Sequence, residues 1–139
     1  MTIYLASPFF NDEELKYVIQ AENTLRELGH TVYSPREHEK RDEIVGSLAW
    51  SAATFEADKK GIDKCDAVVM LYHGNYSDSG TAWECGYAFG IRKPVVVVHI
   101  GEDSNLMVHE GSHTNITIEQ LKDYDFEKMP QNKYKGKMI

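Results

Sequence analysis

The sequence has few cysteines, no excess of positive charge and no long apolar run. Its 139 residues include two cysteines, Cys65 and Cys85, whose spacing matches no zinc-binding or redox motif. A secreted scaffold held by disulfides is therefore not expected. The longest apolar run, around Val95–Val98, is too short to cross a bilayer, and the first residues lack the basic region of a secretory signal. We therefore expect a cytoplasmic protein without a membrane partner.

Acidic side chains outnumber basic ones. The sequence has 22 Asp and Glu against 15 Lys and Arg, which gives a formal net charge of −7. This charge argues against nucleic acid or an anionic membrane surface as the main partner. Hydrophobic residues make up 42% of the chain and charged residues 27%, as in folded globular proteins. With no repeat and no linker, the sequence predicts a single domain over residues 1–139.

Strand-like and helix-like segments alternate along the chain. We predict strands at residues 3–6, 31–33, 67–72, 94–100 and 114–117, and helices from Asn11 to Gly29 and over 47–62, 80–91 and 118–124. The stretches at 36–46, 74–80 and 105–107 are expected to be loops, and the tail from Pro130 is polar and basic. Strands separated by helices form right-handed βαβ units, so the fold class is α/β with a parallel sheet.

Ligands of such sheets bind beyond the carboxyl ends of the strands, so the residues to search are 6–11, 34–46, 73–84 and 101–113. The segment around Asp78–Tyr87 is the richest in polar groups, and Gly80 lets a ligand approach the backbone closely. A helix N-terminus favours negative charge, so we expect Glu84 to stay ionised and able to act as a nucleophile or base. A solvated glutamate that stabilises the helix dipole is the alternative.

The other candidates are weaker when each is taken alone. Asp58 lies late in a predicted helix, where a surface acid is the ordinary reading. Tyr4 lies inside a predicted strand, where a core residue is the ordinary reading, but its hydroxyl needs a partner that a carboxylate in the crevice would supply. The loop Gly74–Gly80 has neither the Walker lysine nor the GxGxxG glycines, and Asp78 would repel a phosphate. Nucleoside triphosphates and dinucleotides are therefore not expected.

Six segments, taken in their order and spacing, resemble the nucleoside 2-deoxyribosyltransferase family. They are Ile3-Tyr4-Leu5-Ala6-Ser7-Pro8-Phe9-Phe10, Tyr33-Ser34-Pro35-Arg36-Glu37, Asp58-x-x-Gly61-Ile62, Cys65-Asp66-Ala67, Asp78-Ser79-Gly80-Thr81-Ala82-Trp83-Glu84-x-x-Tyr87-Ala88 and Asn105-Leu106-Met107. The resemblance covers nearly the whole chain. It implies a flavodoxin-like, doubly wound five-stranded parallel sheet with helices on both faces.

The resemblance also implies an activity, namely the exchange of the base of a 2′-deoxyribonucleoside by double displacement. Glu84 would attack C1′ and form a covalent 2-deoxyribosyl ester, and a second base would attack that ester with overall retention. Tyr4 would orient Glu84, Asp58 would protonate the departing base, and Asp78 would hold sugar hydroxyls. The implied partners are deoxynucleosides and free nucleobases, and no cofactor or metal is implied.

The base-binding residues depart from the family pattern. Members often place an amide side chain after the second strand, whereas Arg36–Glu39 contains neither Gln nor Asn. We expect His38 or Glu39 to face the base instead, with Phe10 and Gly80 among the substrate contacts. The preference between purines and pyrimidines, and the tolerance of ribose, stay open.

The resemblance further implies a homo-oligomer, a hexamer or another assembly of dimers, in which Asn105 and Met107 reach a neighbouring site. Some members end in an aromatic residue whose carboxylate borders a neighbour's site. This chain ends in Ile139, and that role is not carried over to it.

Two other functions are weighed against the transferase. A hydrolase of the same fold would cleave 2′-deoxynucleoside 5′-monophosphates, but Asp78 stands where a serine is expected and would oppose a phosphate dianion. A non-catalytic nucleoside-binding module is compatible with the fold, because fold does not fix function. Such a module has no need for Tyr4, Asp58 and Glu84 together.

Overall fold

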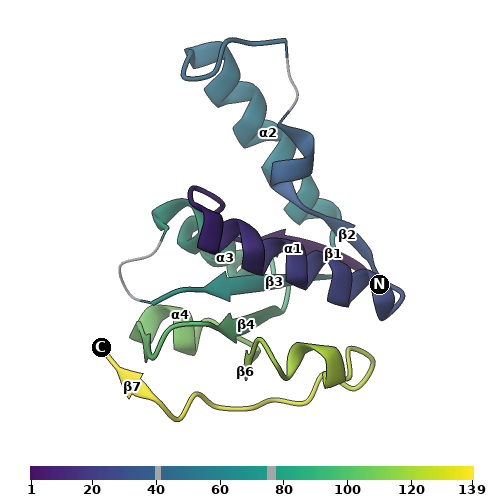
Figure 1. Cartoon of the computed structure of the whole chain (residues 1–139), viewed down its shortest axis with the longest axis vertical. Helices are drawn as coiled ribbons and strands as arrows, with labels where there is room; N and C mark the ends of the chain where they lie inside the picture. Colours follow the sequence, from purple (N-terminus) through teal and green to yellow (C-terminus); the bar gives the residue numbers. More distant parts are fainter. Residues whose placement is uncertain (40–41, 75–77) are drawn as a thin grey trace.

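The computed structural model describes residues 1–39, 42–74 and 78–139. At its centre is a five-stranded parallel sheet in the order β2-β1-β3-β4-β6 (Figure 1). Its strands are β1 (Thr2–Ala6), β2 (Thr31–Tyr33), β3 (Ala67–Tyr72), β4 (Val95–His99) and β6 (Thr114–Thr117). This is the flavodoxin-like order, and it confirms the predicted α/β fold.

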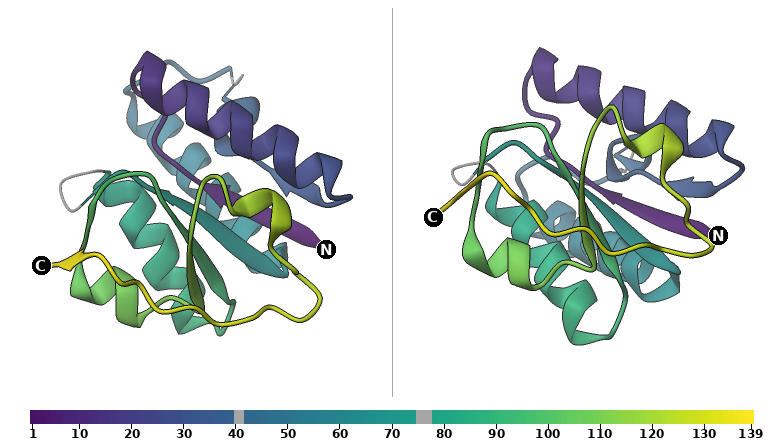
Figure 2. Two further views of the ribbon diagram at one scale, coloured as in Figure 1. Left: turned by 60° about the horizontal axis from the view of Figure 1, so that its bottom comes forward. Right: turned by 90° about the horizontal axis from the view of Figure 1, so that it is seen from below.

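Helices cover both faces of this sheet. They are α1 (Asp12–Glu27), η1 (Pro35–His38), α2 (Leu48–Lys64), α3 (Ser79–Gly90), α4 (Leu106–Glu110) and η2 (Leu121–Asp123). One apolar cluster joins the sheet to Leu25 of α1 and to Leu121 of η2, and the other joins it to Ile62 of α2 and Cys85 of α3. Figure 2 shows α1 and the segment that contains η2 on one side of the sheet and α3 on the other. The predicted doubly wound arrangement is therefore confirmed.

The central strands β3 and β4 coincide with unbroken apolar runs of the sequence. Every residue of β3 and β4 is buried, as expected for parallel strands with helices over both faces. The register of β1 and β2 sets Tyr4 opposite Tyr33, so both side chains lie on the same face of the sheet. That face is the one covered by α2 and α3.

The ends of α1 follow the expected capping residues. The side chain of Asn11 accepts a hydrogen bond from the N–H of Glu14 at 2.9 Å. The carboxylate of Glu14 accepts one from the N–H of Phe10, also at 2.9 Å. Gly29 follows the helix with a φ of +92°, a conformation that glycine adopts without strain.

Some expected elements differ from the structure. The expected loop at 36–46 begins inside η1, which starts at Pro35, whose fixed φ suits a first helical position. Residues 40 and 41 of that loop, and 75–77 of the expected turn at 74–80, lie outside the described residues. Asn105 is not in a loop, because its side chain accepts from the N–H of Met107 at 2.9 Å and caps α4.

The C-terminal part of the chain also differs from expectation. Only η2 forms where a helix over 118–124 was expected, because reciprocal hydrogen bonds between Thr117 and Gln120 favour a turn there. The polar tail contains a short strand, β7 (Lys137–Met138), which pairs in parallel with β5 (Asp103–Ser104). The tail is thus tied to the segment that precedes α4.

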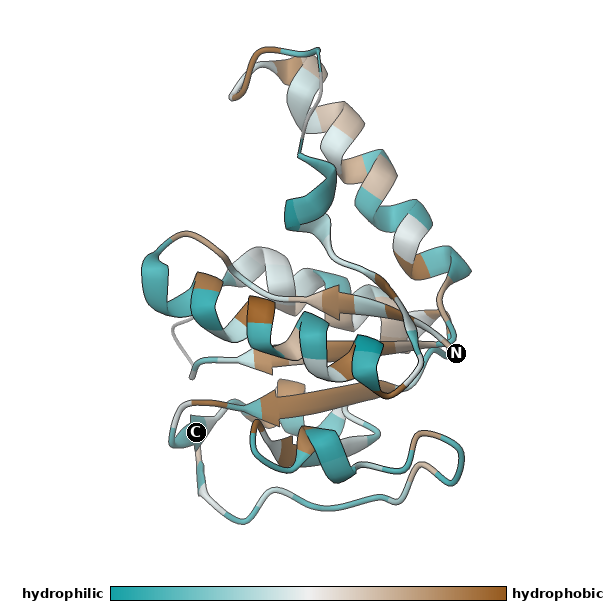
Figure 3. Cartoon of the chain, turned by 45° about the vertical axis from the view of Figure 1, so that its right-hand side comes forward, coloured by the Kyte–Doolittle hydropathy of each residue, from teal (hydrophilic) through white to brown (hydrophobic). Residues whose placement is uncertain are grey.

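Helix α2 extends away from the sheet (Figure 1). Its later part is packed, since Gly61 and Ile62 are buried. Its first part is open, with Leu48 91% and Phe55 47% exposed. Figure 3 shows hydrophobic positions at this projecting end as well as in the central strands. Within the described ranges, no helix is both long enough and apolar enough to cross a membrane.

Candidate active site

A crevice lies beyond the carboxyl ends of β1, β2 and β3. It is lined by Ser7, Pro8, Phe9, Phe10, Pro35, His38, Glu39, Trp50, Thr54, Asp58, Asp78 and Glu84. The chain leaves β1 toward α1 on one face and leaves β3 toward α3 on the other, so the crevice sits at the switch point of the sheet. Three of the four segments singled out in the sequence border it.

Glu84 is bonded to the first strand. The hydroxyl of Tyr4 donates a hydrogen bond to Oε2 of Glu84. Tyr4 is fully buried in β1, while Glu84 is half-buried on α3 at the wall of the crevice. The hydroxyl therefore has the carboxylate partner that the sequence led us to expect.

The expectation that Glu84 stays ionised in the unliganded protein was wrong. Burial raises the pKa of Glu84 to about 8, the hydrogen bond from Tyr4 opposes this rise, and the charges of Asp58 and Asp78 add to it. The helix end does not compensate, because Glu84 lies in the second turn of α3, where the dipole effect has already faded. At neutral pH the carboxyl group is mostly protonated.

Asp78 caps the N-terminus of α3. Its carboxylate accepts hydrogen bonds from the N–H of Gly80 at 3.2 Å, the N–H of Thr81 at 2.8 Å and the hydroxyl of Thr81 at 2.6 Å. These N–H groups are the ones that a bound anion would use at a helix N-terminus. With Asp78 in place they already serve a negative charge of the protein itself.

Asp58 faces the crevice from α2. The hydroxyl of Tyr33 lies 3.5 Å from its Oδ1, in a long hydrogen bond. The charge of Asp58 acts on both members of the Tyr4–Glu84 pair and raises the pKa of each. Asp58 therefore interacts electrostatically with this pair, while its role as the acid stays a prediction from the resemblance.

Gly61 accounts for the glycine of the Asp58-x-x-Gly61 segment. A Cβ built on Gly61 would lie 3.0 Å from a ring carbon of Tyr33 and 3.0 Å from a ring carbon of Tyr4. Helix α2 can approach the two tyrosine rings this closely only because residue 61 has no side chain. The glycine thus sets how near Asp58 comes to Glu84.

The outer part of the crevice carries the expected base contacts. His38 and Glu39 line it from the end of η1, and Phe10 stands at its mouth with 78% of its surface exposed. The ring of His38 is parallel to that of Tyr33, with centroids 4.2 Å apart. The structure therefore brings these three expected residues to one place.

Two further lining residues come from α2. Trp50, in the sequence only one of several aromatics, and Thr54, not singled out at all, line the crevice with Asp58. The hydroxyl of Thr54 is buried without a hydrogen-bond partner among the described residues. The signal that could have found them is their spacing of four residues, which puts all three on one side of the helix.

Gly80, Asn105 and Met107 lie outside this crevice. Gly80 lines the groove between α2 and α3, which Asp58 and Glu84 also border. Asn105 and Met107 line a cavity of about 660 Å³ between α3 and α4. Neither of these two is among the described residues that line the crevice of Glu84.

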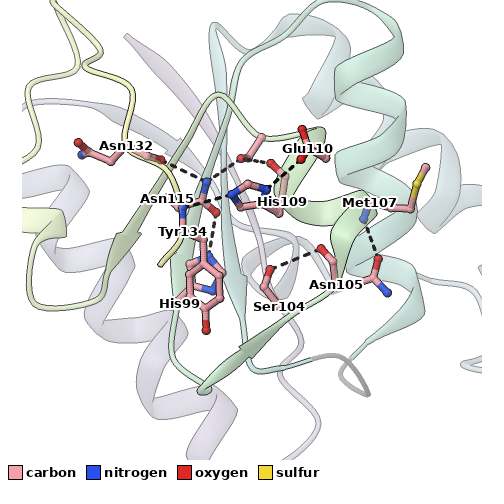
Figure 4. A network of polar contacts seen from close by, with 10 residues as sticks. His99, Ser104, Asn105, Met107, His109, Glu110, Asn115, Asn132 and Tyr134 are labelled. Carbon is pink, nitrogen blue, oxygen red and sulfur yellow. Dashed lines mark hydrogen bonds and ion pairs between the residues drawn. The ribbon is translucent and has the colours of Figure 1, made fainter. Parts of the chain in front are cut away.

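Figure 4 shows the polar contacts between the C-terminal tail and the residues in and around α4. The ring of Tyr134 stacks on His99 with centroids 4.1 Å apart, and its N–H lies 3.2 Å from Nε2 of His109. The N–H of Leu106 donates to the carbonyl of Ile139 at 2.9 Å. The tail is therefore bonded to α4 at Leu106 and at His109.

Among the residues that the structure describes, no three His, Cys, Asp or Glu side chains come together as metal ligands would. The crevice itself offers the carboxyl groups of Glu39, Asp58, Asp78 and Glu84, aromatic walls and, beside Glu84, the hydroxyl of Tyr4. Pairs of carboxyl groups carry out transfer at glycosidic carbons.

Comparison with known proteins agrees with this reading. Residues 3–123 match the sequence model of the family described as Nucleoside 2-deoxyribosyltransferase. A nucleoside deoxyribosyltransferase of Lactobacillus leichmannii is 30% identical over 97% of this chain and 96% of its own length. One from Limosilactobacillus fermentum is 30% identical over 89% and 85%.

The solved structures extend the likeness to the fold. A 2-deoxyribosyltransferase from the psychrotolerant bacterium Bacillus psychrosaccharolyticus superposes with a TM-score of 0.91 at 40% identity, over 96% of this chain and 99% of that one. A CMP N-glycosidase of Clostridium botulinum, with a TM-score of 0.62 and 19% identity over 89% and 95%, shares the fold. On the family match and these relatives, the chain belongs to the nucleoside 2-deoxyribosyltransferase family.

Proposed function

We propose that the protein exchanges the base of 2′-deoxyribonucleosides through a covalent intermediate on Glu84. The observation that carries this proposal is the hydrogen bond from Tyr4 to Glu84, in a crevice that Asp58 also lines. A binding module would have no use for a buried carboxyl group kept beside another acid. A double displacement needs both groups.

For the first half-reaction we assign the proton that the free protein holds on Glu84 to Asp58, so that ionised Glu84 attacks C1′ of the deoxynucleoside. The bond from C1′ to the base nitrogen breaks as the bond from C1′ to the carboxylate oxygen forms, through an oxocarbenium-like state. Asp58 delivers a proton to the departing base and becomes a carboxylate. The products are a free base and a 2-deoxyribosyl ester of Glu84.

In the second half-reaction another base takes the place of the first. Its nitrogen attacks C1′, Asp58 takes up the proton that this nitrogen releases, and Glu84 leaves as a carboxylate. Two inversions at C1′ give overall retention. The enzyme returns to its starting charge, so no further reactant is required.

The remaining crevice residues serve binding. Asp78 accepts three hydrogen bonds on α3, which leaves about one of the roughly four lone-pair positions of a carboxylate, and we assign that position to a sugar hydroxyl. Phe10, His38 and Glu39 contact the base at the mouth. Gly80, in the neighbouring groove that Glu84 also borders, leaves room beside the carboxylate of Asp78 at the start of α3.

A hydrolase acting on 5′-monophosphates is the competing function. Asp78 opposes it, since its negative charge occupies the N–H groups of Gly80 and Thr81 where a phosphate would be held. We therefore expect free deoxynucleosides to be used far better than their 5′-monophosphates.

The test is a chromatographic assay with 2′-deoxyinosine, with and without adenine and with no added phosphate. The proposal requires 2′-deoxyadenosine to appear only when adenine is present. Mass spectrometry of the intact protein after incubation with 2′-deoxyinosine alone should find a 2-deoxyribosyl adduct that is absent from Glu84→Ala. Formation of hypoxanthine and free sugar without any exchange would instead identify a hydrolase.

We also propose that the active form is a homo-oligomer, a hexamer or another assembly of dimers, in which Asn105 and Met107 complete the site of a neighbouring copy. In one chain these residues line a cavity apart from the crevice, and Met107 is 74% exposed. Mixing two inactive variants, Glu84→Ala and Asn105→Ala, should restore activity, because some mixed sites receive both native residues. Light scattering should find more than one chain in the particle, and a lasting monomer with full activity would contradict the proposal.

A further inference from the structure

Tyr33 contacts both the proposed acid, Asp58, and His38 on the base side of the crevice, and the mechanism above does not use it. It lies at the end of β2, opposite Tyr4 in the register of the sheet. The side chain is half-buried, so it is neither an ordinary core residue nor a freely moving surface residue.

The ring of Tyr33 takes part in two stacked contacts. Its centroid lies 5.4 Å from that of Tyr4 at an interplanar angle of 12°, and 4.2 Å from that of His38 at 4°. Tyr4 is the hydrogen-bond donor to Glu84, and His38 lines the outer crevice. Tyr33 therefore links the residue beside the nucleophile with the residue beside the base.

The hydroxyl of Tyr33 points at Asp58, with the oxygen 3.5 Å from Oδ1. Hydrogen bonds among catalytic groups are often long in an unliganded protein and shorten when substrate is bound. A hydroxyl donates more strongly to a carboxylate than to a neutral acid. This contact therefore gains strength as Asp58 gives its proton to the base.

Gly61 keeps this arrangement compact. The space where its Cβ would lie is bounded by ring carbons of both Tyr33 and Tyr4 at 3.0 Å. The two rings are thus held between the sheet and α2, and their hydroxyls reach the two carboxyl groups from one side. The position of Asp58 depends on the ring that its helix packs against.

We infer that Tyr33 is a positioning residue for proton transfer: its stacked ring is held by Tyr4 and His38, and its hydroxyl orients Asp58 and stabilises the carboxylate that forms when the base departs. This inference rests on the proposed role of Asp58 as the acid. It adds a residue that acts on the steps in which Asp58 gives a proton to the departing base or takes one from the incoming base.

The chemistry of the leaving base separates this role from a structural one. 2′-Deoxyguanosine needs a proton on its base in order to leave. N7-Methyl-2′-deoxyguanosine carries a positive charge and leaves as a neutral base without one. Loss of a group that assists proton transfer slows ester formation from the first substrate only, whereas general damage to the site slows ester formation from both.

The experiment measures kcat and KM for both substrates in Tyr33→Phe, which keeps the ring and removes the hydroxyl. We expect kcat/KM for 2′-deoxyguanosine, which reports ester formation alone, to fall about tenfold, part of the 10²–10⁴ that proton transfer contributes. We expect kcat/KM for the methylated substrate to stay within about twofold. An equal loss with both substrates, or no loss with either, would overturn the inference.

Tyr87 offers a matched control. Its hydroxyl donates to Asp63 of the same helix α2, and its ring stacks on Trp83 with centroids 5.5 Å apart at 9°. Neither Tyr87 nor Asp63 is among the described residues that line the crevice. Tyr87→Phe should leave both substrates unaffected, and a loss equal to that of Tyr33→Phe would point to α2 as a whole and contradict the inference.

Asp58→Asn distinguishes failure of the inference from failure of the proposed function. If Asp58 is the acid, this variant slows 2′-deoxyguanosine far more than its methylated form. If Asp58→Asn slows both equally, the acid has been misassigned and the proposed mechanism fails with it. If Asp58→Asn discriminates and Tyr33→Phe does not, the mechanism stands and the role of Tyr33 alone is refuted.

Discussion

The two ends of helix α2 differ in almost every physical respect. The later end lies over the sheet, with Ile62 fully buried and Gly61 against two tyrosine rings. The earlier end projects from the molecule, with Leu48 91% exposed. Asp58 belongs to the packed end and Trp50 to the projecting one. The position of Asp58, the group proposed to move a proton, is therefore fixed by packing. Trp50, which lines the outer crevice, belongs to a part of α2 that few other residues of the chain cover.

The largest effect is expected at the packed end, from Asp58→Asn. Loss of the proton donor should lower the rate of base exchange by about 10²–10⁴, while the fold is kept. Glu56→Gln, on an exposed position of the same helix, is the matched change and should leave the rate unaltered. Initial rates with 2′-deoxyinosine and adenine measure both. Equal rates for the two variants would show that Asp58, which lines the crevice, matters no more to the reaction than Glu56, which does not.

Stability should divide the two ends in the same way. Ile62→Ala leaves a cavity between α2 and the sheet and should lower the free energy of unfolding by about 2–5 kcal/mol. Leu48→Ala removes a side chain that is already in water and should stay within about 0.5 kcal/mol. Urea unfolding at several protein concentrations measures both. A cost at Leu48 that varies with concentration would show that a second copy covers it.

The stability of the segment that precedes α2 should depend on the ion pair between Arg36 and the buried Glu22. Arg36 of η1 binds the buried carboxylate of Glu22 through Nε, at 2.7 Å, and through Nη2. Arg36→Ala removes the charge that pairs with this carboxylate, leaves it the hydrogen bond from the hydroxyl of Ser34 at 2.6 Å, and should cost about 3 kcal/mol. Arg26→Ala, which breaks the exposed pair with Glu37, should cost less than about 1 kcal/mol. Thermal unfolding of the two variants makes the comparison, and equal losses would contradict it.

The smallest of these effects concerns pH. The hydrogen bond from Tyr4 lowers the pKa of Glu84 against the rise caused by burial. Tyr4→Phe removes that opposition, so the pKa rises further and less of the nucleophile is ionised at neutral pH. The ascending limb of kcat/KM should move to higher pH, with about a tenfold loss at pH 7 for a shift of one unit. A loss that is the same at every pH would assign Tyr4 to orientation alone.

The sequence predicted the sheet well because its determinants are local. The runs in β3 and β4 are apolar throughout, and Asn11 and Gly29 mark the ends of α1. The crevice followed from the general rule for parallel sheets. The roles of Tyr4, Asp58 and Glu84 did not follow from spacing. They came from the resemblance, and they stay proposals.

What could not be predicted depends on distant contacts. The protonation of Glu84 follows from burial that only the folded chain creates. The strands β5 and β7 are two residues each, too short to form a periodic pattern. The apolar spacing of Leu48 and Phe55 is that of a buried helix face, yet both are exposed in the single chain. A pattern of residues reports that a surface is apolar and does not report what covers it.

The order of the strands also bears on how the chain is made. Strand β1 is synthesised first but lies between β2 and β3, and its register with β3 joins Ile3 to Ala67. At roughly 5–20 residues per second, about 2–7 s pass on the ribosome between the completion of β2 and the appearance of β3. During that time an apolar strand has one unpaired edge. An unpaired apolar edge can pair with other chains, so this topology leaves β1 open to wrong pairing until β3 appears.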